Sequence, residues 1–184
     1  MKKNIGVIGA GSMGMAMALN LQKKGFYVAI RDIRTDVETK ARTHGLDVAN
    51  SPASLAEKAE FIIISVVNAA QAHQVLFDKE GVTSIAAAGK TILLTPTIAP
   101  EDTEAISKQL LAHGYSVLDA PVSGGPVRAL AGTMSLMLAG DSDVIAQNSS
   151  VLEALSDRIF KLGPRLGDGA RYKLVNNLVA GMNL

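Results

Sequence analysis

Short hydrophobic runs alternate with longer amphipathic stretches along this chain. Five of the runs are rich in β-branched residues and predict strands, at residues 4–9, 27–32, 61–67, 91–95 and 115–120. Because these runs are almost continuously apolar, we expect strands buried on both faces of a parallel sheet. The stretches between and after them predict helices at residues 12–24, 35–44, 52–59, 69–77 and 101–113.

Start signals support two of these helices. Ser51 is a suitable N-cap with Pro52 at the first helical position, and Pro100 is followed by acids that suit the first helical turn. Further strands are expected at 133–140 and 157–163, with a helix near 141–155 between them. Strand alternating with helix predicts an α/β fold of the Rossmann type, doubly wound around a mainly parallel sheet.

Composition narrows the classes of protein. Hydrophobic residues make up 48% of the chain, the net charge is +1, and aromatic residues make up 4%, so neither a nucleic-acid surface nor a base-stacking platform is expected. There is no cysteine, and the three histidines lie far apart, so we expect no metal site. No apolar run approaches the roughly 18 residues of a membrane span, which indicates a soluble, cytoplasmic protein without a membrane partner.

The first predicted strand runs into the sequence "GVIGAGSMG", which contains a Gly-x-Gly-x-x-Gly pattern. The first glycine permits a tight turn, the second lets the backbone approach a pyrophosphate, and the third allows close packing of helix on strand. The following helix directs N–H groups and a positive dipole end toward the phosphates. We therefore expect a dinucleotide to be bound by Gly9, Ala10, Gly11, Ser12, Met13 and Gly14.

An acid at the end of the second strand supports this interpretation. Asp32 lies eighteen residues after Gly14, where a carboxylate can accept hydrogen bonds from both ribose hydroxyls and repel a 2′-phosphate. NAD is therefore expected as cofactor rather than NADP, although Arg31 and Arg34 flank the acid and could soften this discrimination. The alternatives are that Asp32 only caps the next turn and that the glycines form a turn without a ligand.

Three motifs, "GVIGAGSMGMAMALNL", "DAPVSGGPVRALAGTMSLMLAG" and "GARYKLVNN", occur in this order and span almost the whole chain. With them the sequence resembles the β-hydroxyacid dehydrogenase family. The run "VVNAAQAHQVLF" is most similar to the L-threonate dehydrogenase branch of that family. The resemblance implies a longer, homo-oligomeric protein, in which residues 1–166 form the NAD-binding domain and residues 167–184 begin an interdomain helix. The C-terminal helical domain of the family is absent from this chain.

The resemblance also implies roles for individual residues. Substrate binding falls to Ser123, Gly124 and Gly125, whose hydroxyl and backbone N–H groups can hold a carboxylate after a strand end. Catalysis falls to Lys173 and Asn177, which are one helical turn apart. Taken alone, a lysine on a terminal helix is usually a solvated surface residue. Thr97, Val67 and Asn68 are expected near the nicotinamide end of the cofactor.

The expected activity is NAD-dependent oxidation of a small hydroxy acid similar to L-threonate. Activity of the 3-hydroxyisobutyrate or tartronate semialdehyde type is an alternative within the family. A second alternative is an NAD-binding module that does not turn over, which would fit a chain without the second wall of its active site. Imine reduction on the same scaffold is disfavoured by the lysine at position 173.

Overall fold

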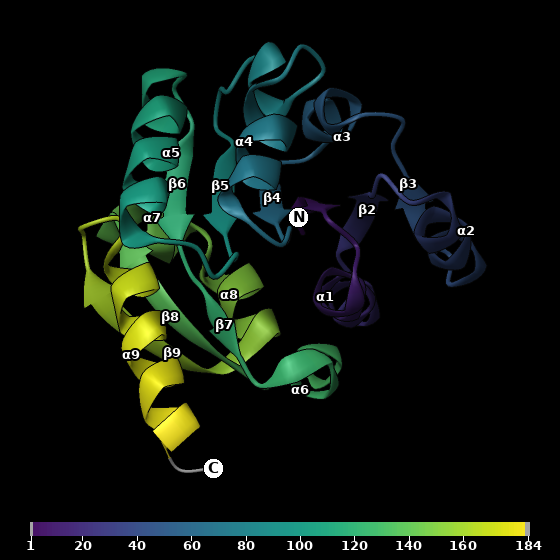
Figure 1. The fold of residues 1–184 in the computed structure, drawn as a ribbon. Helices are drawn as coiled ribbons and strands as arrows, with labels where there is room; N and C mark the ends of the chain where they lie inside the picture. The colour runs from purple at the N-terminus through teal and green to yellow at the C-terminus, as the bar shows by residue number, and fades with distance from the viewer. Residues whose placement is uncertain (1, 183–184) are drawn as a thin grey trace.

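A computed structural model describes residues 2–182. The strands are β1 (Asn4–Ile8), β2 (Tyr27–Arg31), β3 (Asp47–Val48), β4 (Phe61–Ile64), β5 (Thr91–Leu94), β6 (Ser116–Asp119), β7 (Val122–Ser123), β8 (Met134–Gly140) and β9 (Ser156–Gly163). They form one sheet in the order β3-β2-β1-β4-β5-β6-β8-β7, and β9 also pairs with β8 (Figure 1).

The sheet is mainly parallel, as expected. All neighbouring pairs from β3 to β6 are parallel, whereas β8 runs antiparallel to both β6 and β7. The order 3-2-1-4-5-6 is that of the Rossmann fold. The strand order reverses between β1 and β4, and ligands of open α/β sheets bind outside the carboxyl ends of the strands at such a switch point.

The helices are α1 (Ser12–Lys23), α2 (Thr35–Thr43), α3 (Pro52–Lys58), α4 (Ala69–Phe77), α5 (Pro100–Ala112), α6 (Gly125–Ala131), α7 (Ser142–Gln147), α8 (Ser149–Leu155) and α9 (Asp168–Met182), with one 3-10 turn, η1 (Val82–Ser84). Buried side chains of α1 and α8 join one hydrophobic cluster, and those of α3, α4 and α5 join another. The two clusters occupy opposite faces of the sheet, which gives the helix–sheet–helix layers of Figure 1.

Alternation along β4 shows how one strand serves both cores. Ile63 belongs to the cluster that contains Met17 of α1, whereas Ile62 and Ile64 belong to the cluster that contains Leu110 of α5. Successive side chains of a strand point to opposite faces, so a strand covered on both faces is apolar at every position. This explains the continuous apolar runs in the sequence.

The expected helix near 141–155 is wrong in one respect, because it is two helices. Asn148 breaks it: its side chain donates to the carbonyl of Val144 at 2.7 Å and to Oγ1 of Thr91 at 3.2 Å, and it accepts from Nζ of Lys3 at 2.7 Å. Asparagine competes for backbone groups in this way, and a buried one needs all its partners. The cap at Ser51 is confirmed, with Ser51 and Ser54 bonded reciprocally at 3.0 and 3.1 Å.

Four short elements were not predicted, one of them the 3-10 turn η1. The strands β3 and β7 have two residues each, too few for any hydrophobic period to register. Helix α6 follows directly on the segment that we expected to bind a carboxylate, and it begins at Gly125 with Pro126 in its first turn. The remaining predicted ends lie within three residues of the observed ones, the largest difference being β4, which ends at Ile64 rather than Val67.

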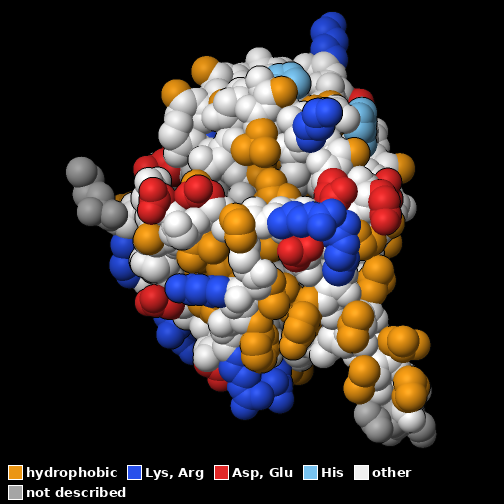
Figure 2. All heavy atoms as spheres, turned by 90° about the vertical axis from the view of Figure 1, so that its left-hand side faces the viewer, with side chains coloured by type: hydrophobic (Ala, Val, Ile, Leu, Met, Phe, Trp, Pro, Cys, Tyr) orange, Lys and Arg blue, Asp and Glu red, His pale blue; other side chains and the backbone are white. Residues whose placement is uncertain are grey.

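Helix α9 leads away from the sheet toward the C-terminus (Figure 1). Its first turns are packed, with Ala170 and Lys173 buried, whereas Leu174, Val175, Leu178 and Met182 are exposed. Figure 2 shows these hydrophobic side chains along the projecting end of the helix. Within residues 2–182, no helix is both long and apolar enough to cross a membrane.

Candidate functional site

The glycine-rich turn joins β1 to α1 at the switch point of the sheet. A Cβ on Gly14 would lie 2.0 Å from the carbonyl oxygen of Gly9, so α1 packs on the turn only because residue 14 has no side chain. Gly11 is the N-cap of α1, and a Cβ on it would meet, among the described atoms within 4 Å, only Nη2 of Arg34 at 3.6 Å. The backbone at Gly11 is therefore open to a ligand, while that at Gly14 is closed by packing.

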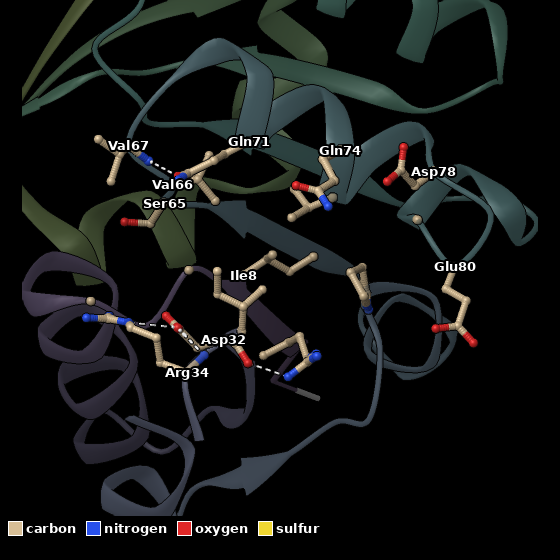
Figure 3. Close-up of a pocket in the computed structure, with 17 residues that line it drawn as sticks. Ile8, Asp32, Arg34, Ser65, Val66, Val67, Gln71, Gln74, Asp78 and Glu80 are labelled. Carbon is tan, nitrogen blue, oxygen red and sulfur yellow. Dashed lines mark hydrogen bonds and ion pairs between the residues drawn. The ribbon is translucent and has the colours of Figure 1, made fainter. Parts of the chain in front are cut away.

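A cavity of about 580 Å³ lies outside the carboxyl ends of β1, β2 and β4. It is lined by the glycine turn, by the segment after β2 and by residues of α4 and the loop that follows it. Figure 3 shows Asp32 and Arg34 on one side of the cavity, Val67 and Gln71 opposite, and Asp78 and Glu80 at the far end. Its volume is in the range of small-molecule and cofactor sites.

Asp32 is buried at the edge of this cavity and paired with Arg34. Oδ1 of Asp32 accepts from the backbone N–H of Arg34 at 3.0 Å and from its Nε at 3.1 Å. The hydrogen bond and the charge of Asp32 raise the pKa of Arg34, which stays a cation. A carboxylate has about four acceptor positions, so Asp32 retains capacity for ribose hydroxyls beside this ion pair.

The segment after β4 forms the opposite wall. Val67 lines the cavity, and its N–H donates to Oε1 of Gln71 at 2.9 Å. Asn68 caps α4, because its Oδ1 accepts from the N–H of Gln71 at 2.9 Å. The structure thus uses Asn68 to begin the helix, and the side chain does not line either cavity among the described residues.

A second cavity of about 550 Å³ adjoins the first, and the two share Gly11 and residues 65–67. It brings together segments that are far apart in the sequence. The predicted site residues that line it are Gly11, Ser12, Met13, Gly14, Val67, Thr97, Ser123, Gly124, Gly125, Lys173 and Asn177. One compartment therefore contains the glycine turn, the segment predicted to bind a carboxylate and the predicted catalytic pair.

Lys173 is the buried cation of this second cavity. Its side chain is on the inner face of α9 with 8% of its surface exposed, and burial lowers its pKa below the ordinary value for lysine. Within the described part of the chain no carboxylate lies within ion-pair distance of its ammonium. A lysine in this state exchanges a proton more readily than a surface lysine does.

Helix α9 is held at its first turn by Asp119, the last residue of β6. Oδ2 of Asp119 accepts from the N–H groups of Gly167 at 2.9 Å and Ala170 at 3.3 Å. Burial raises the pKa of Asp119 to about 6, and the hydrogen bonds from the backbone of residues 167–170 oppose that rise. These bonds fix the start of the helix one turn before Lys173.

The segment after β5 contributes Thr95, Pro96 and Thr97 to the lining of the second cavity. Oγ1 of Thr95 donates to the carbonyl of Ile64 at 2.8 Å and is buried, so it links β5 to β4. Thr97 is exposed, so of the two threonines it is the more accessible to a ligand.

The structure brings most predicted site residues together. Gly9 and Asp32 line the first cavity, and Ala10 is buried within the turn. Several lining residues were missed by the sequence analysis, namely Ser65, Val66, Gln71, Gln74, Asp78, Glu80 and Val122. The glutamines lie three residues apart on α4, and this spacing was the available signal that both face one side. Among residues 2–182, no cluster of three or more His, Cys, Asp or Glu could hold a metal ion.

These features define the class of the protein as a Rossmann-type dinucleotide-binding domain. The open backbone at Gly11, the N-terminus of α1 and the buried acid after β2 fit a pyrophosphate and an adenosine ribose. Residues 4–163 match the family model described as the NAD binding domain of 6-phosphogluconate dehydrogenase, and the chain belongs to this family. NAD is accordingly the cofactor of this domain.

Curated relatives agree with the motifs. The chain is 36% identical over 184 residues to L-threonate dehydrogenase from Cupriavidus necator, covering 100% of this chain and 62% of that protein. It is 32% identical over 183 residues to mitochondrial 3-hydroxyisobutyrate dehydrogenase from Mus musculus, covering 100% of this chain and 54% of that protein. The resemblance to β-hydroxyacid dehydrogenases is thereby confirmed, and the chain spans less than two thirds of these relatives' length.

A solved structure extends the likeness to three dimensions. The 3-hydroxyisobutyrate dehydrogenase from Salmonella typhimurium superposes with a TM-score of 0.91 at 32% identity, covering 99% of this chain and 64% of that one. The predicted fold class is therefore confirmed.

Proposed function

We propose that the chain provides the cofactor site and one wall of the active site of an NAD-dependent dehydrogenase of small hydroxy acids. The observation that carries this proposal is the second cavity, where the glycine turn, Ser123 and Lys173 line one compartment. Dehydrogenation needs a dinucleotide, a holder for the substrate and a proton acceptor at short range. The residues that we propose for these three tasks line that cavity together.

The cofactor would lie across both cavities. The backbone of residues 9–14 would bind the pyrophosphate, Asp32 the adenosine ribose, and Val67 and Thr97 the nicotinamide end. Asn68, which lines neither cavity, would serve the nicotinamide end only indirectly, by beginning α4 next to Val67. When bound, NAD supplies the hydride acceptor. We further propose that NAD is preferred over NADP, because a 2′-phosphate would meet the Asp32 carboxylate.

The substrate would be held by its carboxylate at Ser123 and at the N–H groups of Gly124 and Gly125. Its hydroxyl would face Lys173, whose amine would accept the hydroxyl proton. With NAD supplying the acceptor for the hydride from the same carbon, the C–H and O–H bonds would break, a C=O bond would form, and the lysine would become an ammonium. Asn177, one turn beyond Lys173 on α9, would orient the substrate oxygen by its amide.

The first candidate substrate is L-threonate, because relatives with that activity in their names are 32–36% identical to this chain over 98–100% of its length. Substrates of the 3-hydroxyisobutyrate and tartronate semialdehyde type are alternatives. Also proposed are a boundary between a cofactor domain (1–166) and an outgoing helix (167–184), a homo-oligomeric whole protein and a cytoplasmic location. The second candidate function is an NAD-binding module without turnover, which the cavity beside the glycine turn and Asp32 would support by itself.

The test is calorimetric titration with NAD combined with an assay of NADH formation from L-threonate and 3-hydroxyisobutyrate. We expect NAD binding, and turnover with L-threonate that Lys173→Ala removes while NAD affinity stays within a few-fold. NAD binding without turnover of either acid would support the module instead. Loss of NAD binding in Lys173→Ala would make Lys173 structural and contradict its catalytic role.

A further inference from the structure

A second acid–base pair lies directly beside Asp32. Arg31 is the last residue of β2, and Glu38 lies in the first turn of α2. Nη1 of Arg31 donates to Oε1 of Glu38 at 2.5 Å, and the same nitrogen donates to the carbonyl of Asp32. The two side chains are 25% and 12% exposed, so this is a partly buried ion pair rather than a surface contact.

Arg31 lines the same cavity as Asp32, but its charge is already committed. Its guanidinium is held by Glu38, whereas Arg34 is held by Asp32 and is more exposed. Nε of Arg31 is buried without a hydrogen-bond partner among residues 2–182, so the guanidinium keeps an unused donor. At this end of the cavity the charges of two arginines are therefore neutralised by those of two acids.

This neutralisation of charge affects whether NAD or NADP binds more tightly. NADP differs from NAD by a 2′-phosphate, an anion that arginine binds well because its planar fork matches the phosphate oxygens. Arg31 is close enough to the cavity to serve that phosphate. Nη1 of Arg31 is engaged by Glu38 and by the carbonyl of Asp32, and the unused Nε is buried. Turning the guanidinium toward the phosphate therefore means separating this partly buried pair, which leaves the acid without its cation.

We propose that Glu38 is a specificity-determining residue. It holds the guanidinium of Arg31, at the end of β2, against helix α2 and so keeps this cation away from the 2′ position of the adenosine ribose. Asp32 repels a 2′-phosphate directly, and Glu38 disfavours it indirectly by engaging the partly buried cation that lines the same cavity. This inference rests on the proposed function, since it takes the cavity at Asp32 as the adenosine end of the cofactor site.

The experiment measures the dissociation constants of NAD and NADP by calorimetry for the unaltered chain and four variants. Glu38→Ala should lower the NADP-to-NAD ratio of dissociation constants by about tenfold, the size of one charge-assisted hydrogen bond. Glu38→Gln, which keeps the length of the side chain but not its charge, should give a smaller change in the same direction. The double variant Arg31→Ala/Glu38→Ala should return the ratio to within about twofold of the unaltered chain.

Asp36→Ala is the matched control. Asp36 is an exposed acid in the same helical turn and acts on Arg34 rather than on Arg31, so the ratio should stay within about twofold. An unchanged ratio in Glu38→Ala, an equal change in Asp36→Ala, or a change that persists without Arg31 would each overturn the inference while NAD binding still supports the cofactor site. Failure of the unaltered chain to bind either dinucleotide would overturn the proposed function together with it.

Discussion

Lys173 is buried without a charged partner among the described residues, and this lowers the stability of the folded chain. A desolvated amine is poorly stabilised as a cation, and this is also what lowers its pKa toward the range of a general base. Stability and chemistry therefore oppose each other at this one side chain. Such opposition is common where a site needs an ionisable group in an apolar place.

Replacement of Lys173 by methionine should separate the two effects. Methionine has a similar length and no charge to desolvate, so the free energy of unfolding in urea should rise by about 1 kcal/mol while turnover is lost. Lys108→Met on α5 is the control: this lysine is exposed, and its replacement should change stability by less than about 0.5 kcal/mol. A Lys173→Met chain less stable than the unaltered one would contradict our account of the buried amine.

The site residues that could be predicted from the sequence are those that lie at a characteristic distance from a strand end or within a known motif. The glycines, Asp32 and Lys173 occur at set distances from a strand end or within a motif, so their place could be predicted. Asp119 and Glu38 were missed as partners, because their contacts join elements whose relative position is not written in local sequence. Asp119 meets the backbone of residues 167–170, some fifty residues further along the chain.

At the scale of elements, the turn before α1 assigns different tasks to two glycines three residues apart. Gly14 lets helix and strand approach, and Gly11 leaves its backbone open to the cavity. The same substitution should therefore have two different results.

Gly14→Ala should lower the free energy of unfolding by about 1–3 kcal/mol, because its Cβ would press on the Gly9 carbonyl. Gly11→Ala should change stability by less than about 1 kcal/mol but weaken NAD binding by about tenfold or more, because the new methyl group stands where a pyrophosphate approaches. Denaturation and calorimetry on the two variants make the comparison. Undiminished NAD affinity in Gly11→Ala would remove this turn from the cofactor site.

Asp119 makes the stability of the fold depend on pH. With its pKa raised to about 6, the carboxyl binds its proton more tightly in the folded chain than in the unfolded chain. The stability that comes from binding this proton is therefore present at low pH and is lost as the pH rises from about 4 to about 6, although the hydrogen bonds from Gly167 and Ala170 favour the ionised carboxylate.

Comparison with Asp119→Asn, which does not titrate, isolates this effect. Between pH 4.5 and 6.5 the unaltered chain should lose about 2 kcal/mol of stability relative to the variant. A carbon NMR titration of the carboxyl group should give a midpoint near pH 6. A midpoint below about 4, or a stability difference that does not change with pH, would contradict the raised pKa.

Helices and strands were predicted correctly where the hydrophobic periodicity extended over enough residues. The prediction failed where a contact between distant residues determined the end of an element. The strands β1, β4 and β5 are buried at almost every position because both faces are covered. They and the partly exposed β2 were predicted within a few residues. The break between α7 and α8 depends on Asn148 reaching Lys3 and Thr91, which local sequence does not reveal.

At the scale of the whole molecule, the two adjoining cavities make one continuous site. They share Gly11 and residues 65–67, and together they extend from Asp32 at one end to Lys173 at the other. The sheet order places these residues at the carboxyl edge of the strands, on either side of the switch point. A dinucleotide can therefore connect the acid after β2 with the lysine on α9.

The most direct test of this claim is a two-dimensional amide NMR map recorded as NAD is added to the unaltered chain. We expect shifts at residues 9–14, at Asp32 and at Val67, and also at Thr97 and Lys173, because the nicotinamide end should enter the second cavity. Shifts at the glycine turn and Asp32 alone would mean that the cofactor stops short of the lysine. Saturating NAD without shifts at the turn would contradict the central claim outright.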